Sequence, residues 1–276
     1  MGIVNVTPDS FSDGCGALDA RASFAQCDRL LRDGADILDL GAESTRPGAL
    51  PVPEDEESRR LLPVLRYAVS LGVPVSVDTY KPAVMQMALD AGADIINDVW
   101  ALRWPGDPGG LRGQNVVTSH PQCGVCLMHM HGDPETMQVS PMAGDVVPAV
   151  WAFLQHAARG LTAAGVAAER ICLDPGIGFG KTVAQNFSLL ACQSPLHAMG
   201  FPVLAGWSRK SSLGAVIRRG AEPVPEPRAR VAASVAAALL AVQQGAHIVR
   251  VHDVRETVDA LAVWKAMQAQ LAGPRC

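Results

Sequence analysis

The chain has 276 residues, of which 49% are hydrophobic and 18% are charged, and its formal net charge is −4. This composition predicts a globular protein with a large core and excludes a basic nucleic-acid-binding surface. No apolar run is long enough to cross a membrane, and no signal peptide precedes the first apolar segment, so the sequence favours a cytoplasmic protein. Because composition does not change along the chain, we predict one domain over residues 1–276.

A short apolar run that ends in a polar residue, followed by a helix-like segment, recurs along the chain. The predicted strands lie at residues 2–5, 37–40, 73–78, 94–98, 125–129, 171–174, 203–207 and 247–252. The clearest predicted helices lie at residues 19–33, from Glu54 onward, from Pro82 onward, and at 145–164, 226–244 and 254–271. Residues 103–122 are rich in Pro and Gly and have no helical period, which predicts an irregular connection with an irregular or missing fourth helix.

Eight strand–helix units in a chain of this length favour a (β/α)8 TIM barrel. An open, doubly wound sheet is the alternative, although no dinucleotide-binding glycine pattern follows the first strand. Polar residues fall at or just beyond the predicted strand ends, which share one rim in a barrel and therefore converge on one pocket. These residues are Asn5, Asp78, Asn97, Asp174, Lys210, Arg250 and His252.

The segment from Ile171 to Lys181 carries the most specific local signal. Its apolar run ends in Asp174, and Pro175 cannot continue a central strand. A carboxylate at the mouth of a buried strand costs free energy unless it is paired, which indicates a ligand with hydrogen-bond donors, a helix cap or an ion pair. The sequence from Gly180 onward resembles the end of a phosphate-binding P-loop, but the required earlier glycine is replaced by Pro175, so we reject that motif.

The seven cysteines are an odd number, and in a cytosolic chain they are expected to be reduced core residues. Cys123 and Cys126, followed by His129 and His131, have spacing that admits a zinc interpretation. Cys126 lies inside the apolar run 125–128, however, so strand alternation separates it from Cys123. We therefore favour core cysteines over a zinc site.

The rim residues combine hydrogen-bond acceptors with donors. Arg250 and His252, on one predicted strand, favour a phosphate group. The others match a flat heterocycle with a donor edge and ring acceptors: the carboxylates Asp78 and Asp174, the amide Asn97 and the ammonium of Lys210.

With these residues in view, the chain resembles the bacterial dihydropteroate synthase family of folate biosynthesis. The matching segments span nearly the whole chain and are specific as a set: residues 5–14, 43–48, 76–79, 96–98, 127–130, 173–181, 208–211 and 250–253. The resemblance implies a TIM barrel that joins a dihydropterin pyrophosphate to p-aminobenzoate and releases dihydropteroate and pyrophosphate. It also implies a homodimer, a magnesium ion bound with the pyrophosphate, and inhibition by sulfonamides.

The family's site residues carry over to matching positions of this chain. The resemblance implies pterin contacts from Asp78, Asn97, Met128, Asp174, Lys210 and Arg250. It implies that pyrophosphate is held by Asn5, Thr45, Arg250 and His252, with Asn5 also binding magnesium. The aminobenzoate pocket would be formed by Phe11, Arg46, Pro47, Phe179 and Ser208. The residues implied in catalysis are Asp13, Asp78, Asp174, Lys210, Arg250 and His252.

Two departures and two alternative functions accompany this resemblance. The chain begins at its first strand, whereas family members carry residues before it, and residues 103–122 are longer than the usual connection. A pterin-binding methyltransferase would share the barrel and the pterin carboxylates, but the segments 45–47 and 208–210 favour the synthase. A non-catalytic homologue would be expected to lose Asp13, Asp174, Lys210 or Arg250, and all four are present.

Overall fold

The computed structural model describes residues 1–6, 16–44, 50–106, 110–134, 136–137 and 139–271. Its strands are β1 (Gly2–Asn5), β2 (Leu38–Gly41), β3 (Val75–Asp78), β4 (Ile95–Asp98), β5 (Gly124–Met128), β6 (Ile171–Asp174), β7 (Leu204–Ala205) and β8 (Ile248–Val249). Its α-helices are α1 (Gly16–Arg32), α2 (Glu54–Ser70), α3 (Pro82–Asp90), α4 (Gly113–Ser119), α5 (Val147–Ala163), α6 (Val183–Ala191), α7 (Ser194–His197), α8 (Ser211–Ile217), α9 (Val231–Gln243) and α10 (Val254–Leu271).

The strands form a closed parallel ring, as the sequence predicted. Strands β1 to β6 pair in chain order, and β7 pairs with β8. Single bridges join the two sheets, between Leu173 and Val203 on one side and between Gly2 and Val251 on the other. The backbone supports the second junction, because Ile3 N–H donates to the Val251 carbonyl over 3.0 Å. The TIM barrel is therefore confirmed and the open doubly wound sheet is excluded.

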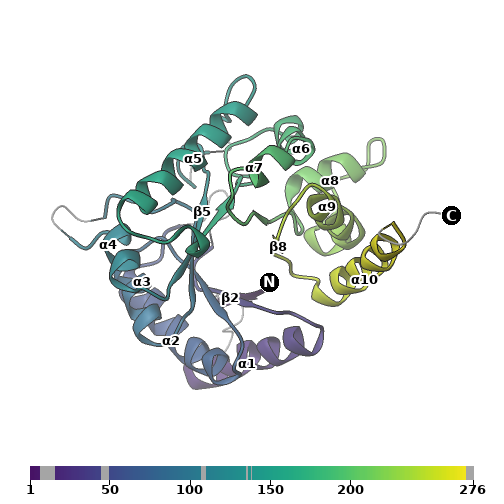
Figure 1. Cartoon of the computed structure of the whole chain (residues 1–276). Coiled ribbons are helices and arrows are strands. Elements are labelled where there is room, and N and C mark those ends of the chain that lie inside the picture. Colours follow the sequence, from purple (N-terminus) through teal and green to yellow (C-terminus); the bar gives the residue numbers. More distant parts are fainter. Residues whose placement is uncertain (7–15, 45–49, 107–109, 135, 138, 272–276) are drawn as a thin grey trace.

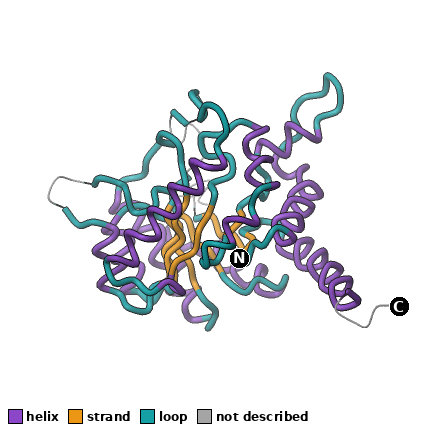
Figure 2. Tube along the Cα trace, turned by 45° about the horizontal axis from the view of Figure 1, so that its top comes forward, coloured by secondary structure: helices purple, strands orange, loops and turns teal. Residues whose placement is uncertain are grey.

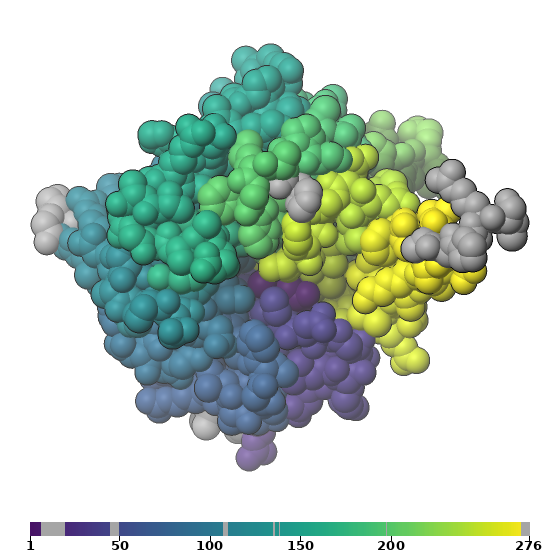
Figure 3. Space-filling model, in the orientation of Figure 1, coloured from purple at the N-terminus to yellow at the C-terminus, as the bar shows by residue number. Residues whose placement is uncertain are grey.

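The helices surround the strands and cover the outer face of the barrel. Figure 1 shows them following one another around the central strands in chain order. Figure 2, from a tilted view, shows the strands in the middle with helices along their flanks. The space-filling view shows the purple start of the chain at the centre of this end, with the later parts arranged around it (Figure 3).

Two apolar layers explain why the strands are apolar on both faces. The outer face packs against helices, for example through Leu38, Leu40 and the α2 residues Leu61 and Leu65, all almost fully buried. A smaller cluster consists of Met1, Cys126 and Leu204, packed with Ile37, Cys172 and Ile248. Because these residues alternate with the helix-facing ones along their strands, they point into the barrel and fill part of its interior.

Local sequence signals account for several helix starts. Pro82 opens α3 in the first helical position, where its missing N–H costs no hydrogen bond. Four acidic residues, from Glu54 to Glu57, occupy the first turn of α2 at the positive end of the helix dipole. Helix α6 begins with a capping box in which Thr182 and Gln185 exchange side-chain and backbone hydrogen bonds.

Residues 103–122 were predicted to form an irregular connection in which the fourth helix is irregular or missing, and this prediction was right only in part. The described residues before α4 have no regular secondary structure, but the fourth helix is present. Helix α4 forms there, with Val116 and Val117 fully buried. A Cβ on Gly113 would lie 3.2 Å from Met85 Sδ, so a residue that resembles a helix breaker instead lets α4 approach α3 closely. The preceding turn is held by Asp98, whose carboxylate accepts the backbone N–H groups of Trp100 and Leu102 at 2.8 and 2.6 Å.

Cys27, Cys123 and Cys126 are buried free thiols, as expected for core cysteines, whereas Cys192 is exposed. Among the described helices, none is long and apolar enough to cross a membrane.

The loop after β6 packs closely against the backbone that follows β5. A Cβ on Gly176, which has a φ of +69°, would lie 1.8 Å from the His129 carbonyl oxygen. Gly72 has a similar φ of +72°, but nothing lies within 4 Å of its Cβ position. Gly72→Ala should therefore lower the free energy of unfolding only by the cost of placing alanine in left-handed backbone, about 1–2 kcal/mol. Gly176→Ala should lower the unfolding free energy by roughly 3 kcal/mol or more, measured by denaturant titration. Equal losses in both variants would contradict the predicted clash.

Candidate active site

The polar residues predicted at the strand ends lie together at the carboxyl-terminal rim of the barrel. In the strand register, Asp78 on β3 lies opposite Asn97 on β4. Met128 on β5 lies opposite Asp174 on β6. Parallel neighbours in register bring these pairs side by side at one end of the sheet, as the sequence analysis required.

Arg250 connects the last strand to the first half of the barrel. Its Nη2 donates to Asp78 Oδ2 at 2.7 Å and its Nε donates to Asp39 Oδ2 at 2.6 Å. Asp39 is fully buried, and its other oxygen accepts the Ser76 hydroxyl at 2.5 Å. The guanidinium therefore spans two carboxylates on β2 and β3, and its position is set by both.

Sequence reasoning did not assign Asp39 to the site. The available signal was a carboxylate in the middle of the apolar run 37–40, at a position whose neighbours Leu38 and Leu40 face the helices. Strand alternation then directs Asp39 into the barrel, where a buried charge requires a partner.

Burial shifts the ionisation of the rim carboxylates. It raises the pKa of Asp78 to about 7, although Arg250 acts in the opposite direction. It also raises the pKa of Asp174, against the Gly176 N–H and the Lys210 ammonium, which favour the carboxylate. Burial disfavours the charged form of Arg250, but Asp39 and Asp78 outweigh it and raise the pKa of the guanidinium.

The β6–α6 loop positions Asp174 and Phe179 together. The Gly176 N–H donates to Asp174 Oδ1 at 2.7 Å. Lys210 reaches this loop from the end of β7, with its Nζ 4.3 Å from the centre of the Phe179 ring. A Cβ on Gly178 would lie 3.3 Å from Lys210 Cδ, so the glycine leaves room for the lysine stem. A carboxylate, an ammonium and an aromatic face thus share one side of the mouth.

Lys181 stabilises the same loop from inside. Its Nζ donates to the carbonyl oxygens of Gly176 at 2.8 Å, Phe179 at 3.0 Å and His129 at 3.3 Å. Burial lowers the pKa of this lysine to about 7, and the charge of Asp174 opposes the shift. Lys181 therefore joins the β6–α6 loop to His129, which directly follows β5.

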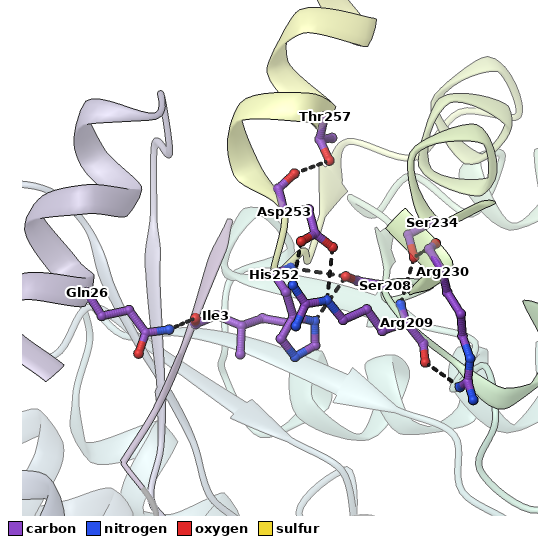
Figure 4. Close-up of polar contacts among 9 residues, drawn as sticks. All are labelled: Ile3, Gln26, Ser208, Arg209, Arg230, Ser234, His252, Asp253 and Thr257. Carbon is purple, nitrogen blue, oxygen red and sulfur yellow. Dashed lines mark hydrogen bonds and ion pairs between the residues drawn. The ribbon is translucent and has the colours of Figure 1, made fainter. Parts of the chain in front are cut away.

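A second hydrogen-bond network joins the ends of β7 and β8 (Figure 4). Ser208 Oγ lies 3.0 Å from His252 Nδ1 and also accepts the His252 backbone N–H at 3.1 Å. The guanidinium of Arg209 pairs with Asp253, at 3.0 and 2.5 Å. Arg209 has a φ of +59°, and this left-handed backbone is held by Arg230, which donates to its carbonyl at 2.9 Å.

Aromatic and thioether side chains line the neighbouring part of the rim. Met128, Met130, Met137 and Phe179 form a buried cluster with Tyr80 and Val99, flanked by Trp100 and Trp104. A cavity of about 210 Å³ opens beside this cluster, lined by Glu43, Ser44, Pro51, Tyr80, Trp100, Trp104, Asp133 and Pro134. Flat, polarizable walls of this kind suit a planar ligand.

The remaining predicted site residues divide into two groups. Asn5 ends β1, half-buried, with Gly41 opposite it in the register. The residues Phe11, Asp13, Thr45, Arg46 and Pro47 lie outside the described residues.

The described rim residues offer few oxygen ligands for a magnesium ion. Among the described residues, there is no group of three or more His, Cys, Asp or Glu side chains suited to a metal ion. Magnesium bound together with a phosphorylated substrate takes only one or two protein oxygens, with phosphate and water supplying the rest. A single amide oxygen at Asn5, on the strand next to β8 with Arg250, fits that arrangement.

Comparisons with known proteins agree with this geometry. A sequence profile of the family described as "Pterin binding enzyme" matches residues 1–252. The dihydropteroate synthase of Neisseria meningitidis serogroup C is 46% identical over 274 residues, which cover 98% of this chain and 93% of that protein.

Solved structures give the same result. Dihydropteroate synthase from Xanthomonas albilineans, solved with 4-aminobenzoic acid, has a TM-score of 0.87 at 49% identity, covering 99% of this chain and 93% of that one. The Burkholderia cenocepacia enzyme complexed with 7,8-dihydropteroate has a TM-score of 0.85 at 50% identity, with 98% and 91% covered. The Yersinia pestis enzyme in a sulfonamide drug complex has a TM-score of 0.87 at 43% identity, with 98% and 94% covered.

The fold and the rim carboxylates thus define a pterin-binding barrel enzyme. With identities of this size over nearly its whole length, the chain belongs to the dihydropteroate synthase family of pterin binding enzymes.

The raised pKa of Asp78 should make ligand binding at the rim depend on pH near neutrality. The family resemblance implies that Asp78 contacts the pterin. Because burial raises the pKa of Asp78 to about 7, a pterin that hydrogen-bonds to the carboxylate would have to displace a proton at lower pH. Pterin affinity should therefore fall as the pH drops below 7, by at most about tenfold per unit for this group, and level off above it. Calorimetry between pH 5.5 and 8.5 measures this slope. Asp78→Asn should bind more weakly and with a shallower slope, whereas affinity that rises on acidification would contradict the assignment.

Proposed function

We propose that the rim of this barrel joins a dihydropterin carrying a CH2–pyrophosphate to the amine of p-aminobenzoate, with the strand-end residues in the roles that the family resemblance implies. The observation that carries the proposal is the convergence of Asp78, Asp174 and Lys210 beside Arg250 and His252 in a family member. Asp78 and Asn97 face the pterin from one side, and Asp174 and Lys210 from the other, with Met128 packing on the ring.

The chemistry follows from the charges at the rim. The pterin methylene loses its bond to pyrophosphate oxygen, and the electron pair leaves with the phosphate. The positive charge that develops on the methylene is delocalised into the pterin ring, where the fields of Asp78 and Asp174 favour it. The aminobenzoate nitrogen then forms the new C–N bond and releases one proton. Its arylamine is a weak base, so positioning and exclusion of water contribute more than a strong general base would.

Arg250 and His252 receive the departing group in this proposal. Arg250 faces the pyrophosphate from its fixed place between Asp39 and Asp78, and His252 is oriented by Ser208. Magnesium, held by Asn5 and the substrate's own phosphates, would supply further charge stabilisation for the leaving group. Thr45 and Asp13 are also expected to contribute to binding of the pyrophosphate and its magnesium ion.

Aminobenzoate is expected to contact Phe179 and Ser208, together with Phe11, Arg46 and Pro47, which lie outside the described residues. Ser208 is buried and oriented by the β8 backbone, which suits a fixed contact. Sulfonamides carry the same arylamine with a sulfonyl group in place of the carboxylate, so we propose that they compete for this pocket.

The decisive experiment is pyrophosphate release with purified protein. We expect release that requires both the pterin pyrophosphate and aminobenzoate, is lost without magnesium, and is inhibited by a sulfonamide. Asp174→Asn should abolish pterin binding, because an amide replaces one acceptor with a clashing donor at a buried pair that contributes roughly 2–5 kcal/mol. Asp259→Asn, an exposed position on α10, is the matched control. Unchanged pterin affinity in folded Asp174→Asn would refute the pterin assignment, and methyl transfer without pyrophosphate release would favour the methyltransferase.

We also propose a homodimer that forms through α9 and α10, which pack against each other. Large apolar side chains on these helices are exposed, including Leu240 at 48%, Val263 at 72% and Met267 at 46%. An exposed apolar surface of this kind favours association. Light scattering at micromolar concentration should give twice the chain mass, and Val263→Asp should reduce it to the monomer. Val139→Asp, at an exposed apolar site elsewhere, should leave the mass unchanged. A monomeric wild-type protein would contradict the proposal.

A further inference from the structure

The turn that follows β7 contains a non-glycine residue in left-handed backbone. The Lys210 N–H donates to the Trp207 carbonyl oxygen at 3.2 Å, and this bond closes a turn whose third residue, Arg209, has a φ of +59°. Glycine or asparagine usually occupies such a position, because most side chains disfavour a positive φ. A strained residue persists only where its surroundings hold it, so the contacts of Arg209 indicate what the strain serves.

The backbone of Arg209 is held from α9, as Figure 4 shows. Its N–H donates to Ser234 Oγ at 2.9 Å, and its carbonyl oxygen accepts Arg230 Nη1 at 2.9 Å. Ser234 is only 3% exposed, and its hydroxyl donates to the Arg230 carbonyl oxygen at 2.7 Å. Both backbone polar groups of Arg209 therefore have partners that are also bonded to each other, and this network holds the turn in its left-handed form.

The side chain of Arg209 binds the segment after β8. Its Nε donates to Asp253 Oδ2 at 3.0 Å and its Nη2 to Asp253 Oδ1 at 2.5 Å. Asp253 directly follows His252, whose Nδ1 lies 3.0 Å from Ser208 Oγ. Ser208 and Arg209 are thus both anchored to this segment. A glycine would adopt the turn without strain, but it could not reach Asp253, which accounts for an arginine at this position.

Lys210 reaches the other neighbour of β7. Strand β7 pairs with β8 on one side and is bridged to β6 on the other, through Val203 and Leu173. The Lys210 Nζ lies 4.3 Å from the centre of the Phe179 ring, and its Cδ lies 3.3 Å from the Cβ position of Gly178, both in the β6–α6 loop. The residues on either side of Arg209 therefore contact opposite neighbours of β7, and the left-handed residue lies where the chain turns from one to the other.

We propose that Arg209 is a positioning residue for the pterin: its left-handed backbone, held by Ser234 and Arg230, sets the direction in which Lys210 extends toward the β6–α6 loop. Arg209 acts on the pterin only through Lys210. This inference rests on the proposed function, which assigns Lys210 to the pterin. Ser208 has its own two hydrogen bonds to His252, so pyrophosphate binding does not depend on the backbone conformation of Arg209.

The test compares two substitutions that differ only in their tolerance of the left-handed backbone. Arg209→Asn and Arg209→Val both remove the guanidinium and its pair with Asp253. Asparagine adopts a positive φ readily, whereas a β-branched valine does not. Gly72→Val is the control, because it places valine at a φ of +72° in an open turn between α2 and β3, at the end of the barrel away from the rim. Calorimetry measures the Kd of 6-hydroxymethylpterin, which carries no phosphate, and of magnesium pyrophosphate.

We expect Arg209→Val to bind hydroxymethylpterin about tenfold more weakly than Arg209→Asn, because binding must restore the left-handed turn that valine disfavours. The two variants should bind magnesium pyrophosphate equally. When each is combined with Lys210→Met, their pterin affinities should agree within about twofold, since no ammonium remains to be placed. Gly72→Val should bind both probes as wild type does.

The outcomes separate this inference from the proposed function. If wild type binds hydroxymethylpterin and Lys210→Met weakens it, but Arg209→Asn and Arg209→Val bind equally, the positioning role is wrong and the function stands. If Arg209→Val weakens pterin binding to the same extent in the Lys210→Met background, or weakens pyrophosphate binding in parallel, the turn supports the site in general and the inference is again wrong.

Two further outcomes are decided in the same experiment. If wild type does not bind the pterin, or Lys210→Met binds it unchanged, the proposed role of Lys210 is wrong and this inference fails with it. If Arg209→Val does not fold, Arg209→Ala takes its place, because alanine also disfavours left-handed backbone but has a smaller side chain. Should that variant also fail to fold, Ser234→Ala, which removes the acceptor of the Arg209 N–H, is compared with wild type by the same criteria.

Discussion

The site depends on one ion cluster, the guanidinium of Arg250 between Asp39 and Asp78. Several carboxylates directed into a barrel mouth repel one another and lose their hydration, and both effects disfavour the ionised form. The planar guanidinium of Arg250 carries several N–H donors, so it pairs with Asp39 at 2.6 Å and with Asp78 at 2.7 Å at the same time. Arg250 directly follows β8, and the two carboxylates lie on β2 and β3. The same contacts therefore also hold the last strand of the barrel against the first strands. The contacts of Arg250 that fix the charges at the mouth of the barrel are therefore the same contacts that help to close it.

Around that cluster, buried cations hold the loops through main-chain oxygens. Lys181 gathers the carbonyls of the β6–α6 loop, Arg230 supports the left-handed backbone at Arg209, and Lys81 binds Val52. A carbonyl partner fixes backbone position directly, whereas a carboxylate partner fixes only the end of a side chain. Loops that must present Phe179 or Ser208 at defined positions are thereby kept in place without regular secondary structure.

The sequence predicted the barrel because parallel strands buried on both faces read as apolar runs, and because polar residues follow those runs. Longer helices such as α5 and α10 were predicted within a few residues, since their periodic faces extend over several turns. Helix α4 was missed because seven residues beginning with Gly113 carry too little period, and its glycine serves close packing. Asp39 was placed in a strand but not in the site, since its partner lies 211 positions away. The ion pairs of Lys81 with Glu43 and Glu57 could not be predicted for the same reason, because spacing along the chain does not reveal which distant charges meet in space.

The closure of the barrel has a consequence for how the chain is made. The bridge between Gly2 and Val251 joins residues from opposite ends of the sequence, and β8 is the last strand to be synthesised. Until β8 docks, Asp39 and Asp78 have no guanidinium between them, so their ionised forms lack the cation that stabilises them in the finished barrel. Among the rim residues, Arg250 and His252 are the last to be synthesised, and they also face pyrophosphate in the proposed site. A chain that ends before them therefore lacks this side of the proposed pocket.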